Sequence, residues 1–330
     1  MATLNANPVT LVDWAKRIDP DGKVAVVAEL LSQTNDILTD MIFQMGNLPT
    51  GERVTVRTGV PTATWRLLNQ GVAASKSTTA QIVEQCGMLE ARGQVDQDIA
   101  ELADDLAGFR LSEGTPHMES MNQEMAQTLF YGNSGLAQEE FTGLSPRYSS
   151  LSAGNASHVI NGGGSGSDNS SIWLIVWGPQ TVYGIFPKNS KAGLIHEDLG
   201  LNDAFDSNNN RFRAYLDRWQ WKAGLALKDW RYAVRICNID ISNLVAQSSA
   251  ADVIELMIKA IHRIPFMTMG KPVFYMNRTV FQMLDIARRN DVIAGGGLKY
   301  DSVDGLPVYT FRGIPVRKSD ALLETEATVA

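Results

Sequence analysis

The feature that most constrains the fold of this chain is a long alternating stretch over residues 52–90. Residues 53–57 alternate polar and apolar side chains, as a strand with one solvated face does, and residues 63–67 repeat the pattern. Residues 69–79 are small and polar, and the chain then returns as a strand over residues 81–88. Two strands alone are marginally stable in water. The pattern therefore predicts a long hairpin that needs a neighbouring surface to lie on.

The rest of the chain mixes helical and extended patterns. Apolar residues at steps of three, four or seven predict helices over residues 24–45, 95–106, 115–131, 249–264 and 278–289. Short apolar runs predict strands over residues 172–177, 181–186, 219–239 and 307–323. These elements do not alternate strictly as strand, helix, strand, so the α+β class is expected.

Local signals refine several of these elements. Thr115 is a favourable cap followed by proline, which predicts that a helix begins there. Ser249 is expected to cap a later helix, in which Glu255 and Lys259 are spaced to form an ion pair. Residues 155–171 are rich in glycine and serine and are predicted to form a flexible loop. One stripe of side chains is expected to pack in the core: Met118, Met121, Met125 and Leu129.

Length and composition indicate a soluble globular protein. The chain has 330 residues, 44% of them hydrophobic and 20% charged, which fits one large domain or two interleaved ones. The net charge is −7 and no long basic run occurs, so a dedicated nucleic-acid binder is not indicated. No signal peptide is evident, and the most apolar stretch, residues 171–187, is too short to span a bilayer as a helix. Cys86 and Cys237 have no zinc spacing, which favours a reducing compartment.

No motif for catalysis or for binding a metal or cofactor stands out. The four histidines are isolated in sequence: His117, His158, His196 and His262. The glycine runs at residues 162–164 and 295–297 lack the lysine and the helix of a phosphate-binding loop. A partial calcium-loop template spans residues 206–217, but Arg211 occupies its glycine position, so a solvated polar turn is expected. The sequence therefore predicts no enzyme, no metal and no organic cofactor.

Four stretches together resemble a known family, the major capsid proteins of tailed bacteriophages. The stretches are residues 65–72 (WRLLNQGV), 170–194 (SSIWLIVWGPQTVYGIFPKNSKAGL), 229–240 (DWRYAVRICNID) and 307–326 (PVYTFRGIPVRKSDALLETE). They are spread over most of residues 50–330, and their joint occurrence in this order carries the resemblance.

The resemblance implies the capsid fold that tailed phages share with herpesvirus capsid floors and encapsulins. Its parts would be an N-terminal helical arm, an extended loop, a peripheral domain with a spine helix, and an axial domain. In this chain they would occupy, in the same order, residues 1–51; residues 52–94; residues 95–150 with 301–330; and residues 151–300. The spine helix would be residues 115–131.

The implied function is a shell. Hexamers and pentamers would close into an icosahedral particle in the virion, assembled in the host cytoplasm, around double-stranded DNA that is not read in sequence. Besides copies of itself, the implied partners are a separate scaffolding protein, a portal protein and a decoration or cementing protein, with no membrane. An encapsulin-like compartment that encloses a cargo enzyme is the alternative, and a small oligomeric enzyme is a further rival.

The extended loop would then lie on a neighbouring subunit. Its large side chains would be inter-subunit contacts, as would the one lysine of the loop, which in some relatives forms an isopeptide cross-link with asparagine. The candidate residues are Trp65, Leu67, Lys76, Ile82 and Val83.

Overall fold

The computed structural model describes most of the chain and divides it into two compact units. The smaller unit contains Gln33, Met88–Met125 and Gly193–Lys222, and the larger contains the rest of the described chain. The described residues are 33, 35–102, 105–205, 208–248, 251–290, 298–303 and 306–330.

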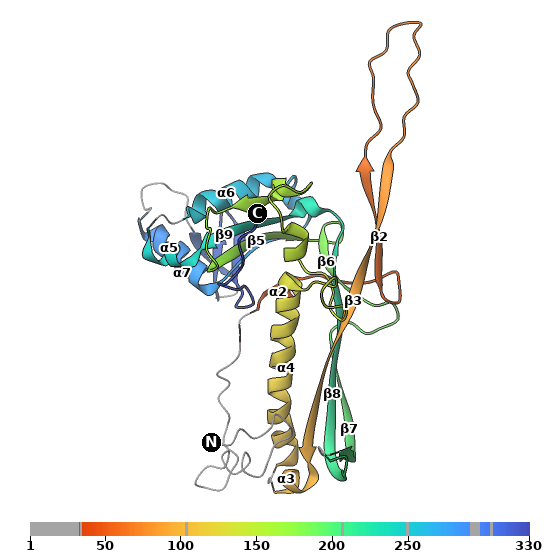
Figure 1. Ribbon diagram of the computed structural model, residues 1–330, viewed down its shortest axis with the longest axis vertical. Coiled ribbons are helices and arrows are strands. Elements are labelled where there is room, and N and C mark those ends of the chain that lie inside the picture. Colours follow the sequence, from red (N-terminus) through yellow and green to blue (C-terminus); the bar gives the residue numbers. More distant parts are fainter. Residues whose placement is uncertain are drawn as a thin grey trace. The chain divides into compact units, whose positions relative to one another are not determined.

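The described elements form a mixed α+β fold (Figure 1). The α-helices are α2 (Ile37–Asp40), α3 (Gln97–Glu101), α4 (Leu106–Tyr131), α5 (Ile241–Ala246), α6 (Val253–Arg263) and α7 (Arg278–Asn290). The 3-10 helices are η1 (Ser145–Tyr148), η2 (Ala156–His158), η3 (Trp230–Tyr232) and η4 (Met267–Met269). The strands are β1 (Phe43–Met45), β2 (Gly51–Gly59), β3 (Thr78–Asp96), β4 (Val159–Asn161), β5 (Asn169–Trp177), β6 (Val182–Phe186), β7 (Leu194–Phe205), β8 (Arg211–Leu227), β9 (Ala233–Asp240), β10 (Lys271–Met276), β11 (Leu298–Val303), β12 (Leu306–Phe311) and β13 (Ile314–Lys318).

Strand β5 is the centre of the larger unit. It pairs antiparallel with β9 on one side and with β10 on the other, and all 9 of its residues are buried. One face presents Ile172, Leu174 and Val176 to a core that α5, α6 and α7 complete. On the other face, Trp173 packs against Phe130 near the end of α4, with ring centroids 6.4 Å apart. A strand covered on both faces is apolar throughout, which explains the continuous run in the sequence.

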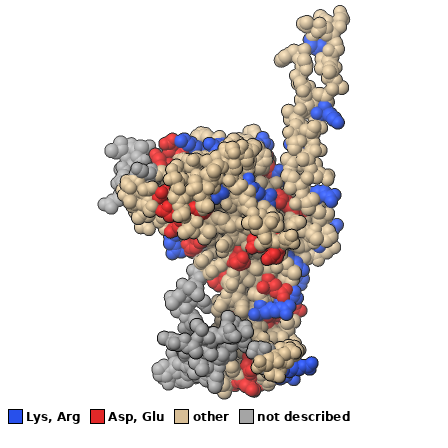
Figure 2. Space-filling view, viewed as in Figure 1, with Lys and Arg blue, Asp and Glu red and all other residues tan. Residues whose placement is uncertain are grey.

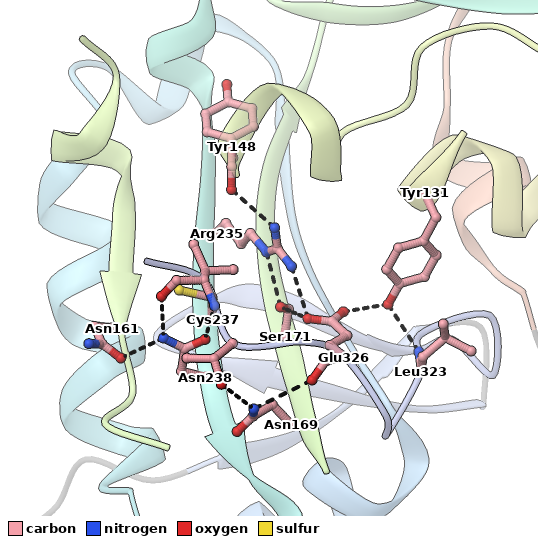
Figure 3. A network of polar contacts seen from close by, with 12 residues as sticks. Tyr131, Tyr148, Asn161, Asn169, Ser171, Arg235, Cys237, Asn238, Leu323 and Glu326 are labelled. Carbon is pink, nitrogen blue, oxygen red and sulfur yellow. Dashed lines mark hydrogen bonds and ion pairs between the residues drawn. The ribbon is translucent and has the colours of Figure 1, made fainter. Parts of the chain in front are cut away.

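The C-terminal segment is held against this sheet by a buried polar network (Figure 3). The Arg235 guanidinium on β9 lies 2.9 Å from the Glu326 carboxylate, and both side chains are about 5% exposed or less. Ser171 on β5 and Tyr131 at the end of α4 donate hydrogen bonds to the same carboxylate. Burial, with the nearby Glu326 charge, raises the pKa of the Tyr131 hydroxyl far above its usual range. Three elements therefore converge on one acidic side chain of the C-terminal segment.

Backbone pairing extends this attachment to the end of the chain. The Glu326 N–H donates to the carbonyl of Asn169 at 2.9 Å, which places the segment beside β5. Asn238 accepts from the Val329 N–H at 2.8 Å and donates to the Val329 carbonyl at 2.9 Å. The Leu151 N–H donates to the carbonyl of Ala330 at 2.9 Å. These hydrogen bonds hold residues 326–330 against β5, β9 and Leu151.

The smaller unit is built around Trp219. Strands β7 and β8 pair antiparallel, and Trp219 on β8 is 4% exposed. The imidazoles of His117 and His196 stack on the indole, with ring centroids 5.0 and 5.1 Å away. A Cβ at Gly93 or Gly114 would approach the indole to 2.9–3.0 Å, so these glycines leave room for it. Two histidines that are isolated in the sequence thus share one aromatic partner.

An ion cluster lies beside this stack. Asp217, which is buried, accepts from Arg110 at 3.0 Å and lies 2.9 Å from Nε2 of His196. Arg110 also pairs with Asp198 at 2.7 Å, and this guanidinium holds the pKa of the Asp198 carboxyl below its usual range. The solvated polar turn expected for the partial calcium template is not found over residues 211–217, which belong to β8, where Asp217 pairs with Arg110; Asp206 lies outside the described residues.

The helix predicted over residues 24–45 is wrong at its C-terminal end. Only Ile37–Asp40 is helical there, and Phe43–Met45 forms β1, parallel to β6. The backbone is already extended at Met41, because pairing of Phe43 with Gly184 overrides the helical periodicity. The predicted residues up to 32 lie outside the described residues.

The two helices that follow the hairpin also differ from prediction. Val95 belongs to β3, and the Asp96 side chain caps the short α3 by accepting from the Asp98 N–H at 2.8 Å. Helix α4 begins at Leu106, so Pro116 lies inside it rather than in its first turn. The Thr115 hydroxyl donates to the Leu111 carbonyl at 3.1 Å and therefore does not cap the helix. Helix α4 continues through Pro116, although proline has no backbone N–H to donate.

Three other predictions need correction. The glycine- and serine-rich residues 155–171 include η2 and β4, which pairs parallel with β9. The strand predicted over residues 219–239 is interrupted by η3, and its parts are the end of β8 and most of β9. Helix α6 is capped by Asp252, which accepts from the Glu255 N–H at 3.0 Å, whereas Ser249 lies outside the described residues.

Several predictions are confirmed. Strands β5 and β6, helix α7 and the strands flanking Gly313 lie close to their predicted positions. The side chains of Met121, Met125 and Leu129 are buried, that of Met118 is only partly buried, and Lys259 pairs with Glu255 at 2.5 Å.

None of the helices in the described part of the chain is both long and apolar enough to cross a membrane.

Breaking the buried Arg235–Glu326 pair should strongly destabilise the subunit. We expect Arg235→Met to lower the free energy of unfolding by about 3–5 kcal/mol, because it leaves a buried carboxylate without its cation. Arg278→Met is the matched control, since Arg278 is 63% exposed and pairs with Asp320 at the surface. That change should cost about 1 kcal/mol or less. Urea denaturation of the unassembled subunit measures both, and equal losses would contradict the prediction.

The Trp219 stack should make the subunit acid-sensitive. Burial lowers the pKa of His117 below its usual value of 6.5, although Asp217 opposes this shift. The unfolded chain therefore binds this proton more readily, and stability should fall as the pH drops below 6.5. We expect His117→Phe, which keeps a stacked ring, to show a smaller loss of unfolding free energy between about pH 7 and pH 5. An unchanged pH dependence would show that His117 does not contribute.

Candidate interaction surface

The predicted hairpin is present in the larger unit and is longer than its paired strands. Strands β2 and β3 pair antiparallel from Gly51 with Gln85 to Gly59 with Thr78. Residues 60–77 continue beyond the last pair as two extended segments with no regular secondary structure (Figure 1, orange). Only local contacts cross between them, such as the bond from the Ser75 hydroxyl to the Thr62 carbonyl at 3.0 Å. The strand predicted over residues 63–67 is not formed, because no partner strand lies opposite to it.

The hairpin is anchored at its base. Glu84 on β3 is 5% exposed and receives two hydrogen bonds from Arg147, at 2.6 and 2.7 Å. Arg147 also donates to the carbonyls of Thr142 and Gly143, each at 3.0 Å. A Cβ at Gly51 would overlap the Glu84 carbonyl oxygen, so the close approach of β2 and β3 here requires glycine. A bidentate Arg–carboxylate pair fixes direction as well as position.

A second contact anchors the neighbouring strand. Tyr183 on β6 donates its hydroxyl to Glu52 on β2 at 2.8 Å. Burial, together with this bond, raises the pKa of Tyr183 above its usual range. Burial also raises the pKa of the Cys86 thiol to about 12, so the thiol on β3 is not a reactive thiolate at neutral pH. The base of the hairpin is therefore structural and rigid.

Beyond the base, apolar side chains lie in solvent. Trp65 is fully exposed, Leu67 is 69% exposed, and Ile82 and Val83 on β3 are 45% and 49% exposed. Lys76 is exposed as well. The sequence predicted these five residues as contacts, and the subunit leaves all five uncovered. Further exposed apolar residues that were not singled out are Val60, Leu68 and Val72.

The charge of the hairpin is a feature that the sequence analysis missed. Between residues 53 and 83 the charged residues are Arg53, Arg57, Arg66 and Lys76, and no Asp or Glu occurs. Figure 2 shows this, since the projecting part carries blue atoms and no red ones. The chain as a whole has a net charge of −7. A count of charge by segment, instead of over the chain, would have revealed the contrast.

No three His, Cys, Asp or Glu side chains of the described residues gather in a way that could hold a metal ion. His158 is buried against Trp230, with ring centroids 4.9 Å apart, and burial lowers its pKa. Burial raises the pKa of the Cys237 thiol to about 11. The exposed, cationic and apolar hairpin is thus the feature that most needs a partner.

A protein family and a solved structure each match nearly the whole chain. A family profile described as major capsid protein GP7 matches residues 19–330. The capsid structure of bacteriophage epsilon15 matches with a TM-score of 0.79 and 33% identity, and the alignment covers 100% of this chain and 99% of that one. No curated protein matches the sequence.

More distant shell proteins also match. An encapsulin complex from Synechococcus elongatus aligns with a TM-score of 0.45 and 10% identity over 64% of this chain and 90% of that one. The capsid of a GTA particle aligns with a TM-score of 0.45 and 10% identity over 70% of this chain and 99% of that one.

Removing the projecting part should leave the subunit folded. We expect a short Gly-Ser linker in place of residues 60–77 to change the free energy of unfolding by less than about 1 kcal/mol, since halving a loop changes closure entropy by only about 0.6 kcal/mol. Val54→Ala at the base is the matched control: Val54 is 2% exposed, and its loss should cost about 1–2 kcal/mol. Urea denaturation of both variants tests this. Global unfolding of the linker variant would place the segment in the subunit's own core.

Proposed function

The chain belongs to the family of major capsid proteins described as GP7, and on this premise we propose that it closes into an icosahedral shell of hexamers and pentamers. The observation that carries the proposal is the full-length match to the epsilon15 capsid structure at 33% identity. A match over nearly the whole of both chains supports the same use of the whole fold. The subunit would act by assembly and not by catalysis.

The hairpin supplies a physical reason for assembly. We assign residues 52–94 to the extended loop of the capsid fold, lying on a neighbouring subunit. Trp65, Leu67, Ile82 and Val83 are large apolar groups, each worth roughly 1.5–3 kcal/mol if fully buried. These side chains are exposed to solvent in an isolated subunit, so the free energy of burying them is gained only when a second subunit covers them. Lys76 would lie in the same contact.

The remaining parts follow the same assignment. Helix α4 would be the spine helix, and it begins about two and a half turns earlier than the sequence suggested, at Leu106. Residues 95–150 and 301–330 would form most of the peripheral domain, and residues 151–300 the axial domain. The two compact units divide the chain differently, because β3, α4 and β8 each continue from one unit into the other.

The contents and partners of the shell are part of the proposal. We propose double-stranded DNA as the content, confined by a chain whose net charge of −7 would not grip phosphates tightly. Assembly would take place in the host cytoplasm with a separate scaffolding protein, a portal protein and a decoration protein. An encapsulin-like shell would instead enclose a cargo enzyme, and analysis of the particle's contents for DNA or a second protein distinguishes the two.

Electron microscopy of the expressed chain tests the proposal. We expect closed isometric particles from the unaltered chain, with scaffold co-expressed if required, and none from the variant with a linker in place of residues 60–77. The variant isolates the role of the loop because its own fold should be intact. A stable monomer or dimer as the mature state of the unaltered chain would overturn the shell proposal. Normal particles from the linker variant would overturn only the role of the loop.

A further inference from the structure

A second surface of the larger unit has the composition of an interface. Three chain segments meet there: the turn after β5, the connection from β8 to η3, and the connection from α6 to β10. Lys228 donates to the Pro179 carbonyl at 3.3 Å, and a Cβ at Gly178 would lie 2.9 Å from the Met269 carbonyl oxygen. Residues 178–180, 228–231 and 263–271 therefore form one continuous surface, here termed the basic-aromatic face.

The charge of the basic-aromatic face is positive. Arg231 is neutralised by Asp229 at 2.7 Å. Lys228 and Arg263 bond to backbone carbonyls instead, and Lys271 is exposed at the start of β10. Within the described chain, no carboxylate forms an ion pair with these three cations. The face thus presents three cations without a carboxylate partner, two of which are held by backbone carbonyls.

The same face exposes large apolar side chains. Trp230 is 36% exposed, Phe266 is 66% exposed and Met269 is 46% exposed. Tryptophan, phenylalanine, methionine and arginine are the residues enriched in the centres of protein interfaces. The imidazole of His158 makes a T-shaped contact with the indole of Trp230 and supports its position. A polyanion such as DNA would satisfy the cations but would leave these apolar groups without a matching surface.

A surface of opposite character follows α4 in the same unit. In residues 133–140, here termed the acidic turn, Leu136 is 88% exposed. Glu139 and Glu140 follow it, and neither has an ion-pair partner among the described residues. Asn133 holds the turn, since its side chain accepts from the Gly135 N–H at 3.0 Å and its carbonyl accepts from the Ala137 N–H at 2.9 Å. A rigid apolar tip beside two carboxylates complements the basic-aromatic face.

We propose that the acidic turn of one subunit docks on the basic-aromatic face of a second copy of this chain. Leu136 would pack among Phe266, Met269 and Trp230, while Glu139 and Glu140 approach Lys228 and Lys271. The two surfaces differ, so the contact is head-to-tail, the kind that closes rings. The inference rests on the proposed shell but does not involve the hairpin.

Complementary charge reversal tests this contact. One variant carries Lys228→Glu with Lys271→Glu, and the other carries Glu139→Lys with Glu140→Lys. Each should fold as the unaltered chain does by circular dichroism, because Lys271 and Glu139 are exposed and Lys228 and Glu140 are partly exposed. Each variant expressed alone should give at least about tenfold fewer closed shells than the unaltered chain, since like charges opposed at an interface penalise association. A single chain that carries all four changes should restore shells, because its basic turn then meets an acidic face at every contact.

The outcomes separate the possible occupants of the face. Lys188→Glu with Lys191→Glu is the control for added negative charge, and we expect it to retain shells. Failure of the chain with all four changes to recover shells would overturn the proposed pairing. If the lysine variant formed shells in normal yield but these shells contained less DNA, the face would be assigned to nucleic acid and the proposal would be overturned. If the unaltered chain formed no shells at all, the proposed function itself would have failed.

Discussion

The Arg235 guanidinium and the Glu326 carboxylate meet in the interior of the larger unit, where almost no water reaches either charge. Removing two ions from water is costly, and their attraction offsets that cost only if the remaining donors and acceptors are satisfied. Here Ser171, Tyr131 and the carbonyl of Tyr148 complete the arrangement. Because these groups come from β5, the end of α4 and the segment after it, the C-terminal segment must return to β5 before the network is complete. The sheet, the long helix and the end of the chain therefore depend on one ion pair.

The sequence predicted the elements whose local pattern agrees with their burial. Strand β5 is apolar throughout because both of its faces are covered, and α7 keeps a clear helical periodicity. The helix prediction for residues 43–45 is wrong because their pairing with β6 is a contact distant in sequence, which periodicity cannot indicate. Strand β7 was not predicted, since nearly all its residues are at least partly exposed and show no alternation. A sequence pattern arises where burial repeats regularly along an element. No pattern arises where pairing with a distant strand alone determines the structure.

The candidate surface was predictable in position but not in charge or anchorage. The alternation around residues 53–57 and the large side chains at Trp65 and Leu67 located the hairpin and indicated its need for a partner. The ion pair between Glu84 and Arg147 joins residues far apart in sequence, so no spacing could indicate it. The same holds for Trp219, whose two imidazole partners come from α4 and β7. Such clusters exist only after the chain has folded.

The uniform positive charge of the hairpin has a consequence for the symmetry of association. Exposed strand pairs with apolar side chains are prone to pair with their own kind, edge to edge, in solution. Two such hairpins brought together would oppose Arg53, Arg57, Arg66 and Lys76 to the same four cations, within the distance over which charges act in physiological salt. That repulsion disfavours a two-fold dimer through the hairpins, in which one surface meets itself. Contact with a different, more acidic surface remains favourable. The sign of four side chains thus disfavours contacts of the hairpin with its own kind and favours contacts between unlike surfaces.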